Sequence, residues 1–134
     1  MIPVFEPYIG DEEVEAVAAA VRRGEISGSF GEEIPAFERE FADYVGARHG
    51  VAVTSGTTAL HLAVAALELE PGSEILMSAS TNVATALAAF HNGCVPVPVD
   101  SEDETWNLDL DLVEALITER TRAIRTSTST SSRP

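Results

Sequence analysis

The sequence predicts an α/β protein in which helices cover both faces of a mostly parallel β-sheet. Short apolar segments alternate with helix-like segments between residues 50 and 125, which is typical of right-handed β-α-β units. The helix-like segments carry apolar residues three or four positions apart, as amphipathic helices do. A chain of 134 residues with 45% hydrophobic and 22% charged residues is globular in composition and contains at most one domain.

Two helices are expected before this alternation begins. The first should start with Asp11 as its N-cap and end before Gly24, because glycine favours the backbone conformation that closes a helix. The second should start near Pro35, where a missing N–H costs nothing, and end at Gly46. Their expected apolar faces consist of Val14, Val17, Ala18 and Val21 in the first helix and Ile34, Phe37, Phe41 and Tyr44 in the second.

The alternating region predicts four strands and three helices. The expected strands cover residues 50–54, 74–77, 94–100 and 121–124. The expected helices cover residues 57–69, residues 81–92 and a segment that Asp109 caps. Pro96 and Pro98 lie two positions apart, so their missing N–H groups fall on the same side of the third strand. This spacing predicts an edge strand or an irregular strand.

Charge and residue usage exclude several functions. The formal net charge is −14, and all eight basic residues are arginine. Such acidity argues against a nucleic-acid partner, and the absence of lysine excludes every mechanism that needs a lysine amine from this chain. No apolar run is long enough for a membrane span, and the start of the chain lacks the basic segment of a signal peptide. The lone Cys94 makes a reducing cytoplasm the expected location.

The stretch from Thr54 to Thr58, Thr-Ser-Gly-Thr-Thr, is the first candidate site. It joins an expected strand to an expected helix, where free backbone N–H groups and hydroxyls suit a phosphate. A simple helix cap is the alternative interpretation. No metal site is expected, because His49, His61 and His91 lie in separate elements. The acidic segment 100–104 lacks the spacing of a calcium loop, and Trp106 is expected to anchor that segment by packing.

Several motifs together resemble one known family, the DegT/DnrJ/EryC1/StrS sugar aminotransferases. The strongest match is VAVTSGTTALHLA at residues 51–63. Further matches follow at family-like distances, and the resemblance covers about residues 1–124. They comprise the Ile-Pro-Val start at residues 2–4, FEREFADYVGA at residues 37–47, PGSE at residues 71–74, NVAT at residues 82–85, PVPVD at residues 96–100, TWN at residues 105–107 and TERTRAI at residues 118–124.

This resemblance implies an N-terminal part of the large domain of a fold type I transferase that uses pyridoxal 5'-phosphate. It implies that Gly56, Thr57 and Thr58 hold the cofactor phosphate, and that Asn82 stands where many members place an aromatic ring over the pyridine. Relatives act on a keto-sugar nucleotide with an amino donor, typically glutamate, and form homodimers. Their covalent lysine has no counterpart here, so we expect no catalytic residue in this chain and no activity of the chain alone. The alternatives are a non-catalytic paralogue or interaction module that docks on a full-length subunit, and a product without function.

The composition changes sharply near Arg125. We therefore expect an N-terminal arm and helix over residues 1–30, a partial large domain over 31–125 and a disordered Ser/Thr tail over 126–134. A frameshift near codon 125 is one hypothesis for the tail. Synonymous codons for residues 125–130 can be chosen so that a two-base shift encodes Val-His-Val-Tyr, which resembles the family's continuation. The nucleotide sequence tests this hypothesis directly.

Overall fold

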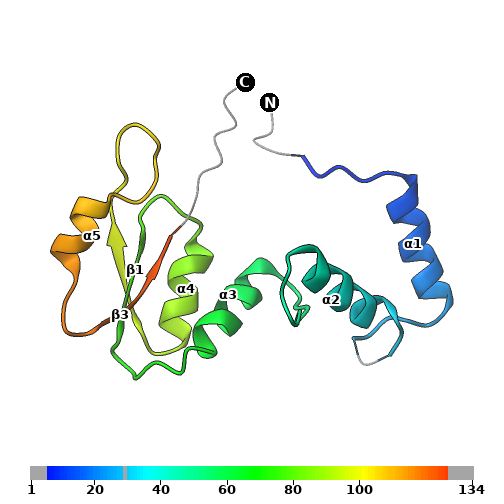
Figure 1. The fold of residues 1–134 in the computed structure, drawn as a ribbon. Coiled ribbons are helices and arrows are strands. Elements are labelled where there is room, and N and C mark those ends of the chain that lie inside the picture. The colour runs from blue at the N-terminus through cyan, green and yellow to red at the C-terminus, as the bar shows by residue number, and fades with distance from the viewer. Residues whose placement is uncertain (1–5, 29, 127–134) are drawn as a thin grey trace. The chain divides into compact units, whose positions relative to one another are not determined.

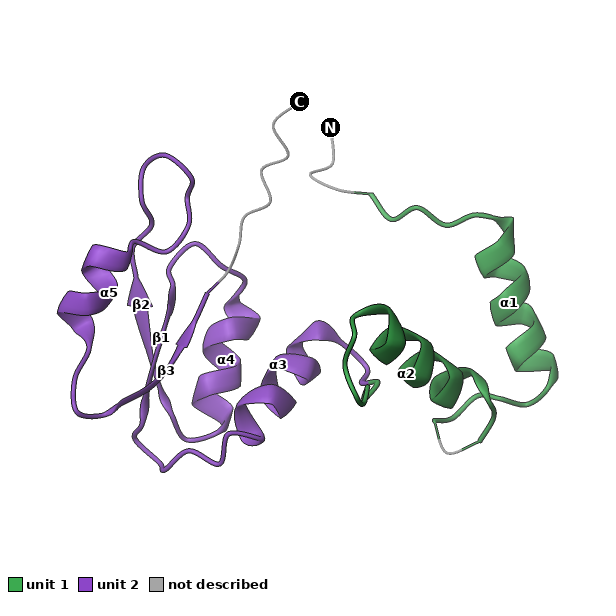
Figure 2. Ribbon diagram, viewed as in Figure 1, with its two compact units in different colours: residues 1–52 green, residues 53–134 purple. Residues whose placement is uncertain are grey.

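The computed structural model describes residues 6–28 and 30–126. The chain forms two compact units, Met1–Ala52 and Val53–Pro134, which are described separately here (Figure 2). The three-part division expected from the sequence stays a prediction, and most of the expected tail lies outside the described residues. No helix in the described part of the chain is long and apolar enough to cross a membrane.

The first unit begins with helix α1 (Asp11–Arg22), which starts one residue earlier than the sequence predicts. Gly10, not Asp11, is the N-cap, and its N–H donates to the Glu13 carboxylate at 2.7 Å. Asp11 is therefore the first helical residue, where its negative charge still favours the helix dipole. The predicted end is confirmed, because Gly24 takes a positive φ of 78° just after the helix.

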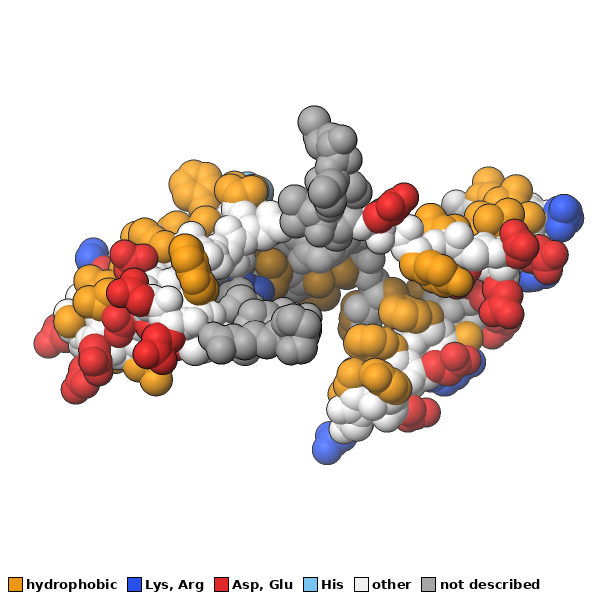
Figure 3. Space-filling view, turned by 90° about the horizontal axis from the view of Figure 1, so that it is seen from above, with side chains coloured by type: hydrophobic (Ala, Val, Ile, Leu, Met, Phe, Trp, Pro, Cys, Tyr) orange, Lys and Arg blue, Asp and Glu red, His pale blue; other side chains and the backbone are white. Residues whose placement is uncertain are grey.

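Helix α2 (Glu33–Tyr44) also forms where it is expected, with Pro35 as its third residue and Gly46 at a φ of 68° after its end. The rings of Phe37 and Phe41 stack with their centroids 5.5 Å apart, and both side chains are more than half exposed. Among the residues of α1 and α2, Ala42 alone is buried. The amphipathic patterns therefore predict the helices correctly, but their apolar faces remain largely exposed in this chain (Figure 3).

The second unit contains a parallel three-stranded sheet with the order β2-β1-β3 (Figure 1). Its strands are β1 (Glu74–Ser78), β2 (Val95–Val99) and β3 (Thr121–Arg125). Its helices are α3 (Gly56–Ala65), α4 (Val83–His91) and α5 (Leu110–Leu116). Every residue of β1 is buried because β1 has a strand on each side. The pairing of β1 with β3 contains one irregularity, between Glu74 and Ile75.

Two small hydrophobic clusters fix the layers of this unit. On one face of the sheet, residues from α3, α4 and the strands pack together, and on the other face the cluster includes α5. The first cluster consists of Ile75, Ala89 and Cys94 with Val64, Leu69 and Ala123, and the second of Leu76, Val99, Leu108 and Val113 with Val97. Figure 1 shows α5 on the opposite side of the strands from α3 and α4. The expected α/β fold with helices on both faces of a parallel sheet is confirmed.

Residues 50–54 do not form the strand that the sequence predicts. An apolar segment becomes a strand only when another strand takes its backbone hydrogen bonds, and the described residues supply none here. The Ala52 N–H instead donates to the Glu38 carboxylate at 2.8 Å. Helix α3 is also shorter than the expected range of 57–69, whereas the Asp109 cap of α5 is confirmed by its bonds to the N–H groups of Asp111 and Leu112.

The amino ends of β1 and β3 are joined by a polar cluster around Glu74. The Glu74 side chain is only 6% exposed, and its carboxylate accepts a hydrogen bond from the Thr118 hydroxyl at 2.6 Å and pairs with Arg120. The Thr118 hydrogen bond and the Arg120 charge hold the pKa of Glu74 below its ordinary value, although burial alone would raise that pKa. This buried carboxylate is therefore stabilised in its ionised form.

Candidate functional site

The turn that starts α3 is built around the hydroxyl of Ser55. Ser55 is the N-cap with extended backbone angles, and its Oγ accepts the Thr58 N–H at 3.2 Å. The Thr58 hydroxyl lies 3.0 Å from Ser55 Oγ and 3.4 Å from the Thr54 hydroxyl. Three hydroxyls are thus gathered at one helix N-terminus, and both interpretations from the sequence, helix cap and phosphate site, are compatible with this geometry.

The backbone of this turn has two N–H groups that are not used in hydrogen bonds within the described part of the chain. Within the described residues, the N–H groups of Gly56 and Thr57 meet no protein acceptor, because the first helical residues have no partner one turn earlier. A Cβ placed on Gly56 would have no atom within 4 Å, so packing in this chain does not require glycine there. The open space, the two donors and the helix dipole together fit a phosphate group.

Asn82 occupies the equivalent position in the next helix. It is the N-cap residue of α4, but its exposed side chain makes no capping hydrogen bond. No hydrogen bond joins Asn82 to Gly56, Thr57 or Thr58. Their helices meet elsewhere, where the Asn92 amide donates to the His61 carbonyl oxygen at 3.2 Å. The structure therefore forms the turn from Ser55 to Thr58 as one unit and leaves Asn82 separate from it.

Arg125 is a feature that the sequence analysis missed. Its guanidinium donates to the buried Thr85 hydroxyl at 2.7 Å, and the Thr81 hydroxyl lies 3.2 Å from that of Thr85. No carboxylate among the described residues forms an ion pair with Arg125. A cation thus lies close to α4 without a negative partner in an otherwise acidic chain. The position of Arg125 directly after a predicted strand was the one signal in the sequence that could have identified it as a candidate site residue.

Two of the three histidines lie closer together than their separate elements suggest. His61 in α3 and His91 in α4 have ring centroids 5.8 Å apart in an edge-on arrangement. The sequence placed them in different helices, and the packing of α3 on α4 brings them together. Among the described residues, no group of three or more His, Cys, Asp or Glu side chains is placed to hold a metal ion.

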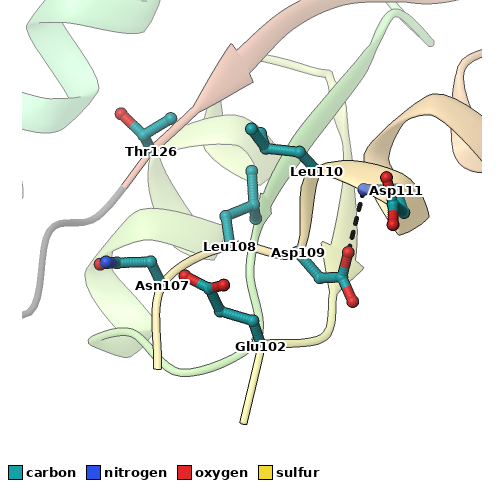
Figure 4. A pocket seen from close by; sticks show the side chains of 7 residues that line it. All are labelled: Glu102, Asn107, Leu108, Asp109, Leu110, Asp111 and Thr126. Carbon is teal, nitrogen blue, oxygen red and sulfur yellow. Dashed lines mark hydrogen bonds between the residues drawn. The ribbon is translucent and has the colours of Figure 1, made fainter. Parts of the chain in front are cut away.

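An acidic pocket of about 560 Å³ lies beside the start of α5 (Figure 4). The Asp109 carboxylate in its wall is engaged in capping α5 (Figure 4). Its lining residues are Glu102, Asn107, Leu108, Asp109, Leu110, Asp111 and Thr126. Three acidic side chains repel a phosphate, so this pocket does not suit the expected cofactor. The neighbouring Trp106 is 67% exposed, and the expectation that it anchors the acidic segment by packing is wrong.

Cys94 is buried in the cluster beneath α4, as the sequence predicts for an inert thiol. A narrower apolar pocket of about 190 Å³ lies between α3, α4 and β3. Leu60 and Val64 line it from α3, Leu67 lines it from the turn after that helix, and Ala123 and Ile124 line it from β3. This pocket has no charged wall except Arg125.

Comparison with known proteins identifies relatives of this chain. A model of the DegT/DnrJ/EryC1/StrS aminotransferase family matches residues 7–127. GDP-perosamine synthase of Caulobacter vibrioides is 42% identical over 123 residues, which are 92% of this chain and 33% of that protein. The chain therefore spans about a third of the length of the curated relatives it matches.

Solved structures agree with this relationship. The crystal structure of 3-amino-5-hydroxybenzoic acid synthase superposes with a TM-score of 0.80 at 41% identity, covering 88% of this chain and 31% of that one. The Escherichia coli GDP-4-keto-6-deoxy-D-mannose-3-dehydratase, solved with bound hydrated pyridoxal phosphate, gives a TM-score of 0.82 at 28% identity, covering 92% and 33%. Pyridoxal phosphate is therefore the cofactor of relatives of this chain, and the chain corresponds to the N-terminal part of their fold.

Proposed function

The chain belongs to the DegT/DnrJ/EryC1/StrS aminotransferase family, and we propose that it supplies the phosphate-binding part of a pyridoxal-phosphate aminotransferase. The observation that carries this proposal is the turn at the start of α3, where two free N–H donors adjoin three hydroxyls. In this proposal the N–H groups of Gly56 and Thr57 bind the cofactor phosphate, and the Thr58 side chain completes the site.

Each residue of the turn has a separate task in this proposal. Ser55 holds the turn in shape through its bond to the Thr58 N–H. Gly56 leaves room for a phosphate oxygen close to the backbone. The family resemblance places Asn82, at the start of α4, near the cofactor ring, where its amide would offer hydrogen bonds but no stacking surface. The bound cofactor would supply the electron sink that amino-group transfer requires.

The substrate class follows from the named relatives, which include a GDP-perosamine synthase and an enzyme acting on a GDP-linked keto-sugar. We propose a keto-sugar nucleotide as amino acceptor, an amino acid such as glutamate as donor and a homodimeric assembly for the complete enzyme. The buried free thiol of Cys94 fits a reducing compartment, and we place the protein in the cytoplasm.

The chain alone should not transfer amino groups. The covalent anchor of the cofactor and the base that moves the proton are both lysine functions, and this sequence has no lysine. Cofactor binding and catalysis are thus separable here. The N-terminal part should bind the phosphate reversibly, and activity requires a lysine from elsewhere.

Binding measurements test the phosphate site. Titration of the chain should show saturable binding of pyridoxal 5'-phosphate, competition by inorganic phosphate and much weaker binding of pyridoxal, which lacks the phosphate. Gly56→Ala should weaken binding about tenfold or more by filling the space for the phosphate, without loss of stability, because the added methyl group meets no protein atom. Thr126→Val, outside the turn, is the control. Equal binding of pyridoxal and its phosphate would refute the proposed site.

A further inference from the structure

The apolar pocket between α3, α4 and β3 has one polar corner. Its volume is about 190 Å³, and small or aliphatic side chains form most of its wall. Arg125 and Thr85 are the exceptions, and the Arg125 guanidinium donates to the Thr85 hydroxyl at 2.7 Å. The aliphatic wall includes Leu60, Ala63, Val64, Ala88, Ala89 and Ala123. The pocket therefore combines an apolar interior with a single cationic side chain.

Small side chains leave this space open. Ala88 and Ala89 of α4 are each 1% exposed, and Ala63 and Ala123 contribute no more than a methyl group from α3 and β3. An apolar cavity of roughly 150 Å³ is large enough for a six-membered carbon ring, because an engineered cavity of that size binds benzene. The pocket of about 190 Å³ therefore has room for a ring or a branched chain of similar size.

Arg125 is a partly buried cation with unused hydrogen-bond donors. A guanidinium carries several N–H groups in a rigid fork, and the Thr85 hydroxyl is the one acceptor that the described residues provide for that of Arg125. The chain has 22 acidic residues, and none of those described forms an ion pair with Arg125. Removing a charge from water without a negative partner costs free energy, and a paired carboxylate offsets that cost. The free donors therefore indicate a binding position for an anion.

The wall of the pocket selects among anions. A phosphate carries more charge and more acceptor oxygens than one guanidinium satisfies, and the aliphatic wall would leave the remaining oxygens without partners. A carboxylate presents two oxygens in one plane, which match two parallel N–H groups of a guanidinium. Its apolar remainder would replace water along the aliphatic wall, which is favourable. The arrangement therefore suits a carboxylate that is attached to a small apolar body.

We propose that this pocket binds a small carboxylate ion with an aliphatic or cyclic body. Arg125 pairs with the carboxylate, and the apolar wall surrounds the body. The hydroxyl of Thr85, a residue that is 4% exposed, holds the guanidinium beside the pocket. Residues 54–58 do not line this pocket, so it is separate from the turn proposed to bind the cofactor phosphate. The proposal does not depend on the proposed function.

Three probes separate the two parts of the proposed ligand. Titration of the full chain with cyclohexanecarboxylate, followed by NMR, should show saturable binding. Cyclohexylmethanol has the ring without the charge, and acetate has the charge with almost no apolar surface. Each of these two should bind about tenfold more weakly or worse, because one lacks the charge-assisted hydrogen bonds and the other lacks the apolar contact. Absence of saturable binding would overturn the proposal, as would equal binding of cyclohexanecarboxylate and cyclohexylmethanol.

A matched pair of arginine variants tests the cationic corner. Arg125→Gln should weaken cyclohexanecarboxylate binding about tenfold or more, because the charge-assisted hydrogen bonds are lost. Arg122→Gln changes the net charge equally on the same strand and should leave binding unchanged. Arg122 does not line the pocket, and its guanidinium donates to the backbone carbonyl groups of Glu119 and Thr121. Equal weakening by both variants would overturn the proposal, because a general loss of positive charge would then explain it.

A second pair of variants tests the apolar wall. Ala63 is exposed and lines the pocket from α3, so the longer side chain of Ala63→Leu can enter the space and should weaken cyclohexanecarboxylate binding several-fold. Ala65→Leu, equally exposed on the same helix but outside the pocket wall, is the control and should bind like wild type. Circular dichroism verifies that each variant is folded. Unchanged affinity in folded Ala63→Leu would place the ligand elsewhere and overturn the proposal.

Discussion

The two compact units bury their apolar side chains to very different extents. In the second unit, Leu76, Val99 and Val113 are almost completely enclosed between a sheet and its helices. In the first unit, the apolar faces of α1 and α2 are exposed, and Val17 for example is 65% accessible to solvent. A sheet provides a surface against which helices can pack, and the described residues of the first unit form no sheet. The difference shows that amphipathic spacing can form a helix without supplying a partner for it.

Leu76→Ala should produce the largest loss of stability. Leu76 has no exposed surface, and its truncation leaves a cavity in the cluster beneath α5. We expect unfolding to become easier by about 3 kcal/mol, measured by urea denaturation. The matched change in the first unit, Phe41→Ala, removes a half-exposed ring and should cost less than half of that. Equal losses would contradict the difference in burial between Leu76 and Phe41.

Glu74→Gln should produce a smaller loss that depends on pH. The pKa of Glu74 is lowered in the folded chain, so its ionised form stabilises the fold above the ordinary carboxyl value of 4.5, and this contribution is lost as pH falls below it. The variant should therefore be less stable than wild type at pH 7, and the difference should shrink as the pH falls below about 4. Urea midpoints over this pH range provide the measurement.

Exposed Glu114 in α5 provides the control for that series. Glu114→Gln should leave the pH dependence of stability unchanged, because its side chain forms no ion pair within the described residues. A constant difference between wild type and Glu74→Gln across the pH range would show that hydrogen-bond geometry, and not charge, carries the effect.

Asp109→Ala should reduce stability by about 1 kcal/mol, because two N–H groups at the start of α5 lose their acceptor. Asp109→Asn retains an acceptor oxygen and should recover most of the loss. Thermal unfolding followed by circular dichroism distinguishes the two variants. A full loss with asparagine would attribute the effect to the charge at the helix dipole instead of to the cap.

Val17→Ser should have the smallest effect of the series. Its side chain is largely in solvent, so removing apolar surface there changes burial little, and we expect a change within about 0.5 kcal/mol. A loss above 1 kcal/mol in the isolated chain would show that the apolar face of α1 is covered in solution. Such a result would remove the difference in apolar burial between the two units.

Local signals in the sequence predicted much of the fold correctly. Gly24 and Gly46 mark helix ends, Asp109 marks a cap, and Pro96 with Pro98 identifies an edge strand because each acts through its own backbone. Features that depend on distant partners were not predictable in this way. Residues 50–54 read as a strand but have no partner strand among the described residues.

In the candidate site, too, the local features were predictable from the sequence and the long-range contacts were not. The turn from Ser55 to Thr58 is predictable because its hydrogen bonds connect neighbours in the sequence. The contact of Arg125 with Thr85 and the approach of His61 to His91 join residues that are 40 and 30 positions apart. Only the packing of the helices and strands brings these groups together, and neither helical nor strand periodicity encodes it.

Borohydride reduction of the chain with pyridoxal 5'-phosphate tests the central claim, that this chain holds the cofactor phosphate but cannot anchor the cofactor covalently. Peptide mass mapping after reduction reports where any cofactor is attached. We predict saturable binding that dialysis reverses, with reductive labelling confined to a trace at the α-amino terminus. A stoichiometric adduct at any side chain of this lysine-free sequence would contradict the account.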